Sequence, residues 1–165
     1  MKGIVLIACM LILAGCGAKP VMPVPDGEIQ VSRIMDFRTS DMDPMKGEAR
    51  LIVDYKGFEK YLSDYAILES PVFLDSDDLE AIKKIDEEYF RTGAIGVAVS
   101  VESSGSNTVE GKKAKIQGDV LILLIERKEA GIGTTDIATR HSVFLLDSAD
   151  VSGIRAAEVE RILAK

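Results

Sequence analysis

The chain holds few residues that could carry out catalysis. It contains a single histidine, His141, and two cysteines, Cys9 and Cys16. One histidine cannot supply the several nitrogen and sulfur ligands of the usual zinc site. A Ser-His-Asp triad would need His141 as its base, and no serine of the chain stands in a nucleophile-elbow pattern. We therefore predict no catalytic site, no metal and no cofactor, and we expect His141 to have a structural role in a strand.

Two loops of small polar residues are the candidate binding sites. One runs from Ser103 to Asn107 and the other from Gly131 to Thr139. Binding residues concentrate on loops above a rigid scaffold, and small side chains let a partner approach the backbone closely. We expect both loops to connect consecutive strands of one sheet region; the alternative is that serine and glycine are simply the usual residues of long hairpins. The candidate binding residues are Ser103, Ser104, Ser106, Asn107, Thr134, Thr135 and Asp136.

The amino terminus indicates export and lipidation. Lys2 precedes an apolar stretch from Ile4 to Leu13, which is too short to span a bilayer but has the length of a secretory signal. The four residues Leu13-Ala14-Gly15-Cys16 then resemble the bacterial lipobox, in which cleavage leaves a lipid-modified cysteine at the new amino terminus. The resemblance implies a signal peptide at residues 1–15 and a lipid on Cys16. The alternatives are an ordinary secretory signal or a short buried helix.

The lipobox also implies the location and limits the partners. We expect the protein on the extracytoplasmic side of the outer or the cytoplasmic membrane, with the lipid on Cys16 as its membrane contact. Residues 1–15 carry one basic side chain, Lys2, so the net charge of −7 becomes −8 after cleavage. An acidic body is a poor ligand for nucleic acid or anionic lipid. We therefore predict a protein partner in the cell envelope and no nucleic acid.

The mature chain divides into a tether and one domain. Residues 16–27 contain Pro20, Pro23 and Pro25 and no hydrophobic period, which is typical of an extended spacer of about 3.1 Å per residue. Residues 28–165 have the length of one ordinary domain.

Hydrophobic periodicity places the elements of this domain. Two helices are expected between residues 55 and 90, the second opening at Asp77 with Glu80 as a capping-box-like pair. In the first, the stripe of Tyr55, Phe58, Tyr61, Leu62 and Tyr65 indicates a buried face, and the alternative is an aromatic ligand-binding face.

Alternation of apolar residues predicts the strands. They cover residues 28–37, 49–54, 94–102, 108–117, 120–125 and 141–146, with a bulge at Gly111. Residues 152–163 form either a helix or a further strand, and their spacing favours a helix. The predicted fold class is α+β, a mostly antiparallel β-sheet of five or six strands with two helices on one side.

The order of motifs from about residue 50 to residue 148 resembles the C-terminal domain of the PrcB family and related lipoproteins. The similarity lies in Gly57–Leu62, in Tyr89-Phe90 before a small-and-valine strand, in Ser103–Ser106, and in Gly133–Ala138 before a hydrophobic strand. The chain departs from the family at its Thr-Gly-Gly-Tyr-like turn, where Ser104-Gly105-Ser106-Asn107 lacks the aromatic residue. The resemblance implies a noncatalytic, β-rich accessory role, and no catalytic residue carries over from it.

These observations lead to three hypotheses about function. The first is a lipid-anchored accessory or binding protein, a subunit or modulator of another envelope protein, with no catalytic site. The second is a binder of a small ligand or envelope polymer through the aromatic helix face, which would require Tyr61 and Tyr65 to be exposed. The third is a hydrolase that uses His141 with a serine and Asp136 of the two loops.

Overall fold

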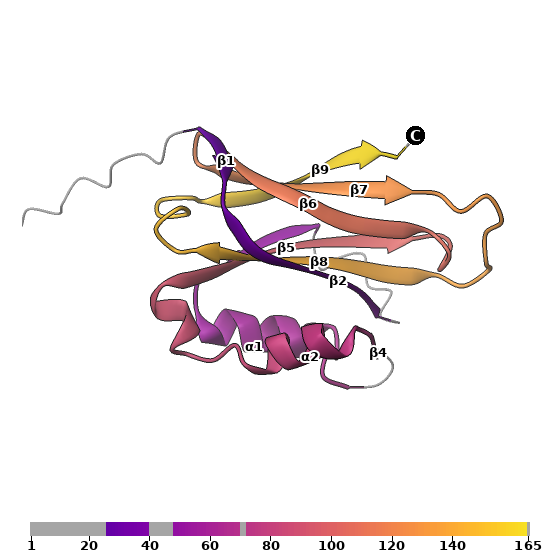
Figure 1. The fold of residues 1–165 in the computed structure, drawn as a ribbon, viewed down its shortest axis with the longest axis horizontal. Helices are drawn as coiled ribbons and strands as arrows, with labels where there is room; N and C mark the ends of the chain where they lie inside the picture. The colour runs from indigo at the N-terminus through magenta and orange to yellow at the C-terminus, as the bar shows by residue number, and fades with distance from the viewer. Residues whose placement is uncertain (1–25, 40–47, 70–71, 165) are drawn as a thin grey trace, which may run out of the picture.

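Two β-sheets are stacked on each other, and a layer of helices covers one of them (Figure 1). The computed structural model describes residues 26–39, 48–69 and 72–164. The signal peptide, Cys16 and nearly all of the predicted tether lie outside these residues. Within the described residues the elements are β1 Gly27–Ile29, β2 Val31–Thr39, β3 Ala49–Ile52, α1 Tyr55–Asp64, β4 Val72–Phe73, α2 Ser76–Lys83, a 3-10 turn Tyr89–Arg91, β5 Gly93–Glu102, β6 Thr108–Gln117, β7 Val120–Lys128, β8 Ala138–Asp147 and β9 Ala156–Leu163.

The strand order is β1-β6-β7-β9 in a four-stranded sheet and β3-β5-β8-β2-β4 in a five-stranded sheet. All neighbouring strands are antiparallel except β7 and β9, which are parallel. The predicted α+β class and mostly antiparallel pairing are confirmed. The predicted strand count of five or six is too low, because the described residues form nine strands in two sheets.

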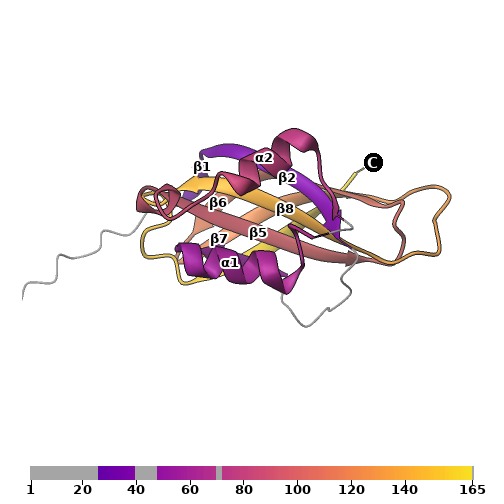
Figure 2. The same cartoon turned by 90° about the horizontal axis from the view of Figure 1, so that it is seen from below.

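The helices lie on one side of the molecule, as predicted. Helices α1 and α2 cover the outer face of the five-stranded sheet (Figure 2), where Phe58 and Tyr61 of α1 and Ile82 of α2 are buried against that sheet. A second core fills the space between the two sheets. We call the sheet faces toward this second core the inner faces.

The helix boundaries follow local capping. Helix α1 begins after Asp54, whose carboxylate accepts a hydrogen bond from the Gly57 N–H at 2.7 Å. Helix α2 begins after Asp75, which accepts from the Asp77 N–H at 2.8 Å. The predicted start at Asp77 is therefore too late, because Asp75 and not Asp77 provides the cap.

The tail of the domain forms strand β9 (Ala156–Leu163), so the prediction of a helix at residues 152–163 is wrong. Ala157 and Val159 point inward and pack on the core between the sheets, while Glu158 and Glu160 alternate with them. This alternation suits a strand, and β9 pairs with β7 from Val120↔Ala156 to Arg127↔Leu163. The expected first strand also differs: it is two strands, because β1 pairs with β6 in one sheet and β2 pairs with β8 in the other.

The described chain enters the sandwich at one end, and three strands finish at the other end. The described chain enters at one end, where Gly27 pairs with Ile116 near the end of β6. Strands β5, β7 and β9 all finish at the opposite end, on the right in Figure 1. Since β6 has ten residues, the two ends are about 33 Å apart. No helix of the described residues is long and apolar enough to cross a membrane.

Candidate functional site

The two predicted binding loops lie together at the end where β5 and β7 finish. Residues 103–107 lead from β5 to β6, and residues 129–137 lead from β7 to β8. Each loop therefore passes from one sheet to the other, and the expectation that each joins strands of one sheet region is wrong. Because both connections cross at the same end, the loops meet. We call residues 103–107 and 129–137 together the loop pair.

Hydrogen bonds join the two loops into one surface. The Gly105 N–H donates to the Asp136 carbonyl at 2.8 Å, and the Thr134 N–H donates to Ser104 Oγ at 2.9 Å. Ser106 Oγ donates to Thr134 Oγ1 at 3.1 Å. A Cβ at position 105 would overlap the Asp136 carboxylate, so a side chain there would force that carboxylate to move. The loop pair is thus fixed in shape before any partner binds.

The candidate residues divide into buried and exposed groups. Ser104 and Asn107 are buried, and the Asn107 side chain accepts from the Ala130 N–H and donates to Glu102. These two residues hold the loops together and cannot contact a partner through their side chains. Ser106 is half-buried. The candidate residues on the exposed surface are Ser103, Thr134, Thr135 and Asp136.

Two arginines beneath the loop pair were not predicted from the sequence. Arg38 on β2 and Arg140 on β8 face each other across the two strands, and both donate to the Gly105 carbonyl, at 3.3 and 2.6 Å. Arg38 also pairs with Asp136 at 3.2 Å. The pKa of Asp136 is lowered by a hydrogen bond from Thr134 and by the Arg38 charge. The charged side chains at the base therefore hold the loop pair to the five-stranded sheet.

Exposed apolar side chains gather at the same end. Ile132, in the middle of the second loop, is 90% exposed, and Ile137 and Val101 beside the loops are 47% and 40% exposed. Ile162 and Leu163 at the end of β9 are exposed as well. A large apolar side chain that is almost fully exposed contributes the most favourable free energy when a partner buries it. The sequence signal for Ile132 is an isolated isoleucine between two loop glycines.

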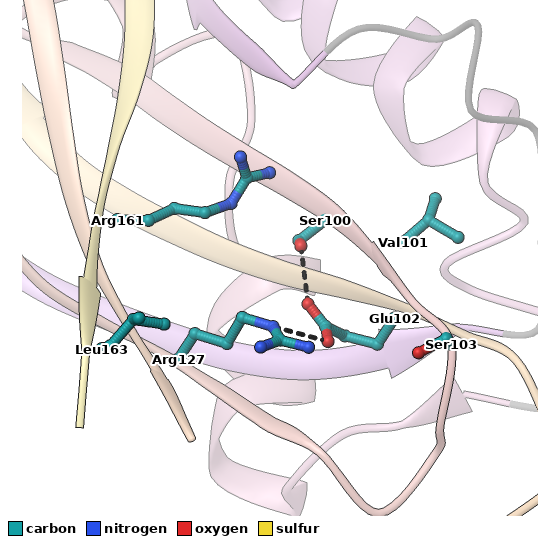
Figure 3. Close-up of a pocket in the computed structure, with 7 residues that line it drawn as sticks. All are labelled: Ser100, Val101, Glu102, Ser103, Arg127, Arg161 and Leu163. Carbon is teal, nitrogen blue, oxygen red and sulfur yellow. Dashed lines mark hydrogen bonds and ion pairs between the residues drawn. The ribbon is translucent and has the colours of Figure 1, made fainter. Parts of the chain in front are cut away.

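A hollow opens beside the loop pair between the ends of the two sheets (Figure 3). Its volume is about 400 Å³. Glu102 lies in it, 3% exposed, and accepts hydrogen bonds from Ser100 Oγ at 2.9 Å and Arg127 Nε at 2.9 Å. Burial raises the pKa of Glu102, but the hydrogen bonds from Asn107, Ser100 and Arg127 outweigh burial and hold the pKa below its usual value. The hollow is lined by Ser100, Val101, Glu102, Ser103, Arg127, Arg161 and Leu163.

His141 is a core residue. It is fully buried, its ring stacks on Phe37 at 4.9 Å, and its two ring nitrogens lie 3.0 Å from Thr39 Oγ1 and from the Tyr61 hydroxyl. Both ring nitrogens are thus used in hydrogen bonds inside the core, which leaves neither to act as the base of a triad.

The aromatic stripe of α1 is also buried. Phe58, Tyr61 and Tyr65 are 1%, 1% and 2% exposed. Burial raises the pKa of the Tyr61 phenol well above its ordinary value. The expectation of a buried face is confirmed, and the alternative of an aromatic ligand-binding face has no exposed ring here to bind with.

The acidic side chains of the described residues form no metal centre. Three or more His, Cys, Asp or Glu side chains nowhere converge within this part of the chain in a way that could hold a metal ion. The cluster at the start of α2 has other roles: Asp75 caps the helix, and Asp78 pairs with Arg33 at 2.6 Å.

Comparison with known proteins identifies no relative. No protein-family model matches the chain, and no curated protein and no solved structure matches it.

Proposed function

We propose that the protein is a lipid-anchored accessory protein of the bacterial cell envelope that binds a protein partner through its loop pair. The observation that carries this proposal is the arrangement of the two loops. They are hydrogen-bonded into one preformed surface at the end of the sandwich opposite Gly27, the first residue of β1. The PrcB-like order of motifs in the sequence supports the same noncatalytic role.

The geometry suits a binding surface that projects away from a membrane. With lipid on Cys16, residues 17–26 would enter the domain at Gly27. The strands then place the loop pair about 33 Å farther along the molecule. A partner could therefore reach the loops without contacting the anchor.

The surface itself has two properties of a protein-binding site. Its backbone is fixed by hydrogen bonds between the loops, so little conformational entropy is lost on binding. At its tip Ile132 offers an exposed apolar side chain, and the exposed polar side chains of Thr134 and Thr135 follow in the same loop; an apolar centre with a polar rim is usual in interfaces.

The anchor can be tested by fractionation. The Cys16→Ala variant removes the predicted lipid acceptor, and we expect the wild-type protein in the membrane fraction and the variant outside it or in unprocessed form. The described fold should be unchanged, because Cys16 lies outside it. A variant that is processed and sediments with membranes as the wild-type protein does would contradict the anchor.

The docking surface can be tested in the native envelope. A photoreactive amino acid placed at Thr135 of the full chain should crosslink to one protein, which mass spectrometry then identifies. Val53 is the matched control site, because it is 57% exposed but follows β3 near the end of the sandwich where Gly27 lies. The same crosslinked protein in equal yield from both sites, or crosslinks at Thr135 to lipid alone, would contradict the proposal.

A further inference from the structure

The hollow beside the loop pair is the end of the inter-sheet core, where the inner faces change from apolar to charged. On β5 the inward side chains run from Ala94 and Ala98 to Ser100 and Glu102. On β7 they run from Leu121, Leu123 and Ile125 to Arg127, and on β9 from Ala157 and Val159 to Arg161 and Leu163. The two sheets thus finish in this hollow, which we call the recess; it is lined by charged and hydroxyl side chains and by the apolar side chains of Leu163 and Val101.

The side chains that line this recess include two arginines and one glutamate. Its charged lining residues are Arg127, Arg161 and Glu102, a net charge of +1, whereas the whole chain carries −7. Glu102 is already neutralised, because Arg127, Ser100 and Asn107 all donate to its carboxylate. Outside the lining, Glu129 also pairs with Arg127 and Glu48 pairs with Arg161, so a ligand carboxylate would bind by displacing one of these exposed carboxylates.

Arg127 and Arg161 have guanidinium N–H groups that donate no hydrogen bond within the described part of the chain. Arg127 donates from Nε to Glu102 and from Nη1 to Glu129, and Arg161 donates from Nη2 to Glu48 at 3.0 Å. Among the described residues, Nη2 of Arg127 and both Nε and Nη1 of Arg161 donate to no acceptor. In Figure 3 both guanidinium groups extend from their strands into the recess toward β5.

The Arg161 ion pair is easily exchanged. Glu48 is 65% exposed and Arg161 38% exposed, and ion pairs in such positions contribute little to stability. A ligand carboxylate that enters the recess could replace Glu48 and form a bidentate pair with the planar guanidinium. Arg127 would remain with Glu102 and provide a second donor.

We propose that this recess binds a carboxylate that carries a small apolar group. The guanidinium donors of Arg161 and Arg127 fit the carboxylate, the hydroxyls of Ser100 and Ser103 lie nearby, and Leu163 fits the apolar group. A singly charged carboxylate would replace the Glu48 carboxylate without changing the charge around Arg161, whereas a phosphate dianion would add a further negative charge beside Glu102 and Glu129. The volume of about 400 Å³ lies within the range of small-molecule sites. Such a carboxylate comes either from a free organic acid or from the carboxyl terminus of a peptide.

A titration with charged and neutral probes tests the proposal. The full chain, solubilised in a nonionic detergent, is titrated with 4-methylpentanoate and with N-acetyl-alanyl-leucine, and in parallel with the neutral amide of each, while NMR follows the arginine Nε–H signals. We expect the Arg161 signal to shift with a carboxylate and not with the matching amide. A response to the acid alone assigns a free organic acid, and a response to the peptide alone assigns a peptide terminus. No response to either carboxylate, or equal responses to carboxylate and amide, overturns the proposal.

Variants on one strand provide matched controls. Arg161→Gln should weaken carboxylate binding at least tenfold, because it removes the charge that forms the bidentate pair. Arg155→Gln should leave binding unchanged, since Arg155 is 83% exposed and lies at the opposite end of β9. Glu48→Gln should tighten binding several-fold by freeing Arg161. Equal binding by the Arg161→Gln variant, with an unchanged melting temperature, overturns the proposal. The assay contains no protein partner, so its result is independent of the proposed docking by the loop pair.

Discussion

The carboxylate of Asp36 on β2 accepts a hydrogen bond at 2.9 Å from the backbone N–H of Gly111 on β6, and this bond joins the two sheets. Gly111 is the site of the predicted bulge, where the register of β6 against β7 shifts between Gly111 and Lys113. Ser142 of β8 donates to the same Asp36 oxygen at 2.5 Å. A half-buried acid thus satisfies the N–H group that the bulge would otherwise leave unpaired.

Asp36 should make the folded protein less stable as the pH rises. Burial raises the pKa of Asp36 above the ordinary value of an aspartate, in spite of the hydrogen bonds from Ser142 and Gly111. A raised folded-state pKa means that the contribution of Asp36 to stability is present below the unfolded-state pKa and is lost as the pH rises through the folded-state pKa. Asp36→Asn keeps an acceptor for Gly111 and should abolish this loss.

Urea unfolding between pH 4 and pH 7 measures this difference. The variant should gain stability relative to the wild-type protein as the pH rises. Asp119→Asn, at a 60% exposed position, is the control and should follow the wild-type curve. A variant Asp36→Asn that is progressively less stable than the wild-type protein toward pH 7 would contradict a raised pKa of Asp36 in the folded state.

Glu102 should have the opposite pH dependence. Its pKa is lowered because three hydrogen bonds outweigh the effect of burial, so its contribution is present above the unfolded-state pKa and is lost as the pH falls through the folded-state value. Glu102→Gln leaves Arg127 with Glu129 alone and should reduce the free energy of unfolding at pH 7 by about 2 kcal/mol. Denaturant unfolding measures the change, and Glu160→Gln, at a 47% exposed position, should stay within about 0.5 kcal/mol of the wild-type value. An equally small effect at both positions would contradict the importance of the buried pair.

Gly111 should not tolerate a side chain. A Cβ there would lie 2.6 Å from Ile34 Cγ2 and 2.9 Å from Phe144 Cζ, between the two sheets. We expect Gly111→Ala to lower the free energy of unfolding by about 1–3 kcal/mol through overpacking. Gly131→Ala is the matched control, because a Cβ at that position would have no atom within 4 Å, and its effect should be under about 0.5 kcal/mol. Thermal unfolding of both variants decides the prediction.

Local patterns predicted much of the fold. The strand at residues 108–117 has the predicted bounds, because its alternation is bounded by the Ser103–Asn107 loop and by Gly118, which has a φ of 63°. The assignment of strands to two sheets could not be predicted, since β1 and β2 are consecutive but find different partners. The spacing of the tail favours a helix because the inward residues of β9 do not form a regular apolar alternation: Ala157 and Val159 are followed by Arg161, and the strand depends on pairing with β7.

The candidate site was only partly predictable for the same reason. Composition identified both loops, but their contact depends on the sheet-to-sheet crossings, which bring Gly105 to Asp136. Arg38 and Arg140 meet through strand register and not through sequence spacing. Arg161 reaches the hollow only because the tail is a strand.

Docking of a protein partner by the loop pair can be measured as the affinity of that partner for an Ile132→Asp variant. Ile132 is 90% exposed, so the substitution should leave the melting temperature unchanged. We expect the partner identified by crosslinking at Thr135 to bind this variant at least tenfold more weakly than the wild-type protein, and to bind Val53→Asp with wild-type affinity. Equal affinities for Ile132→Asp and the wild-type protein would contradict docking by the loop pair.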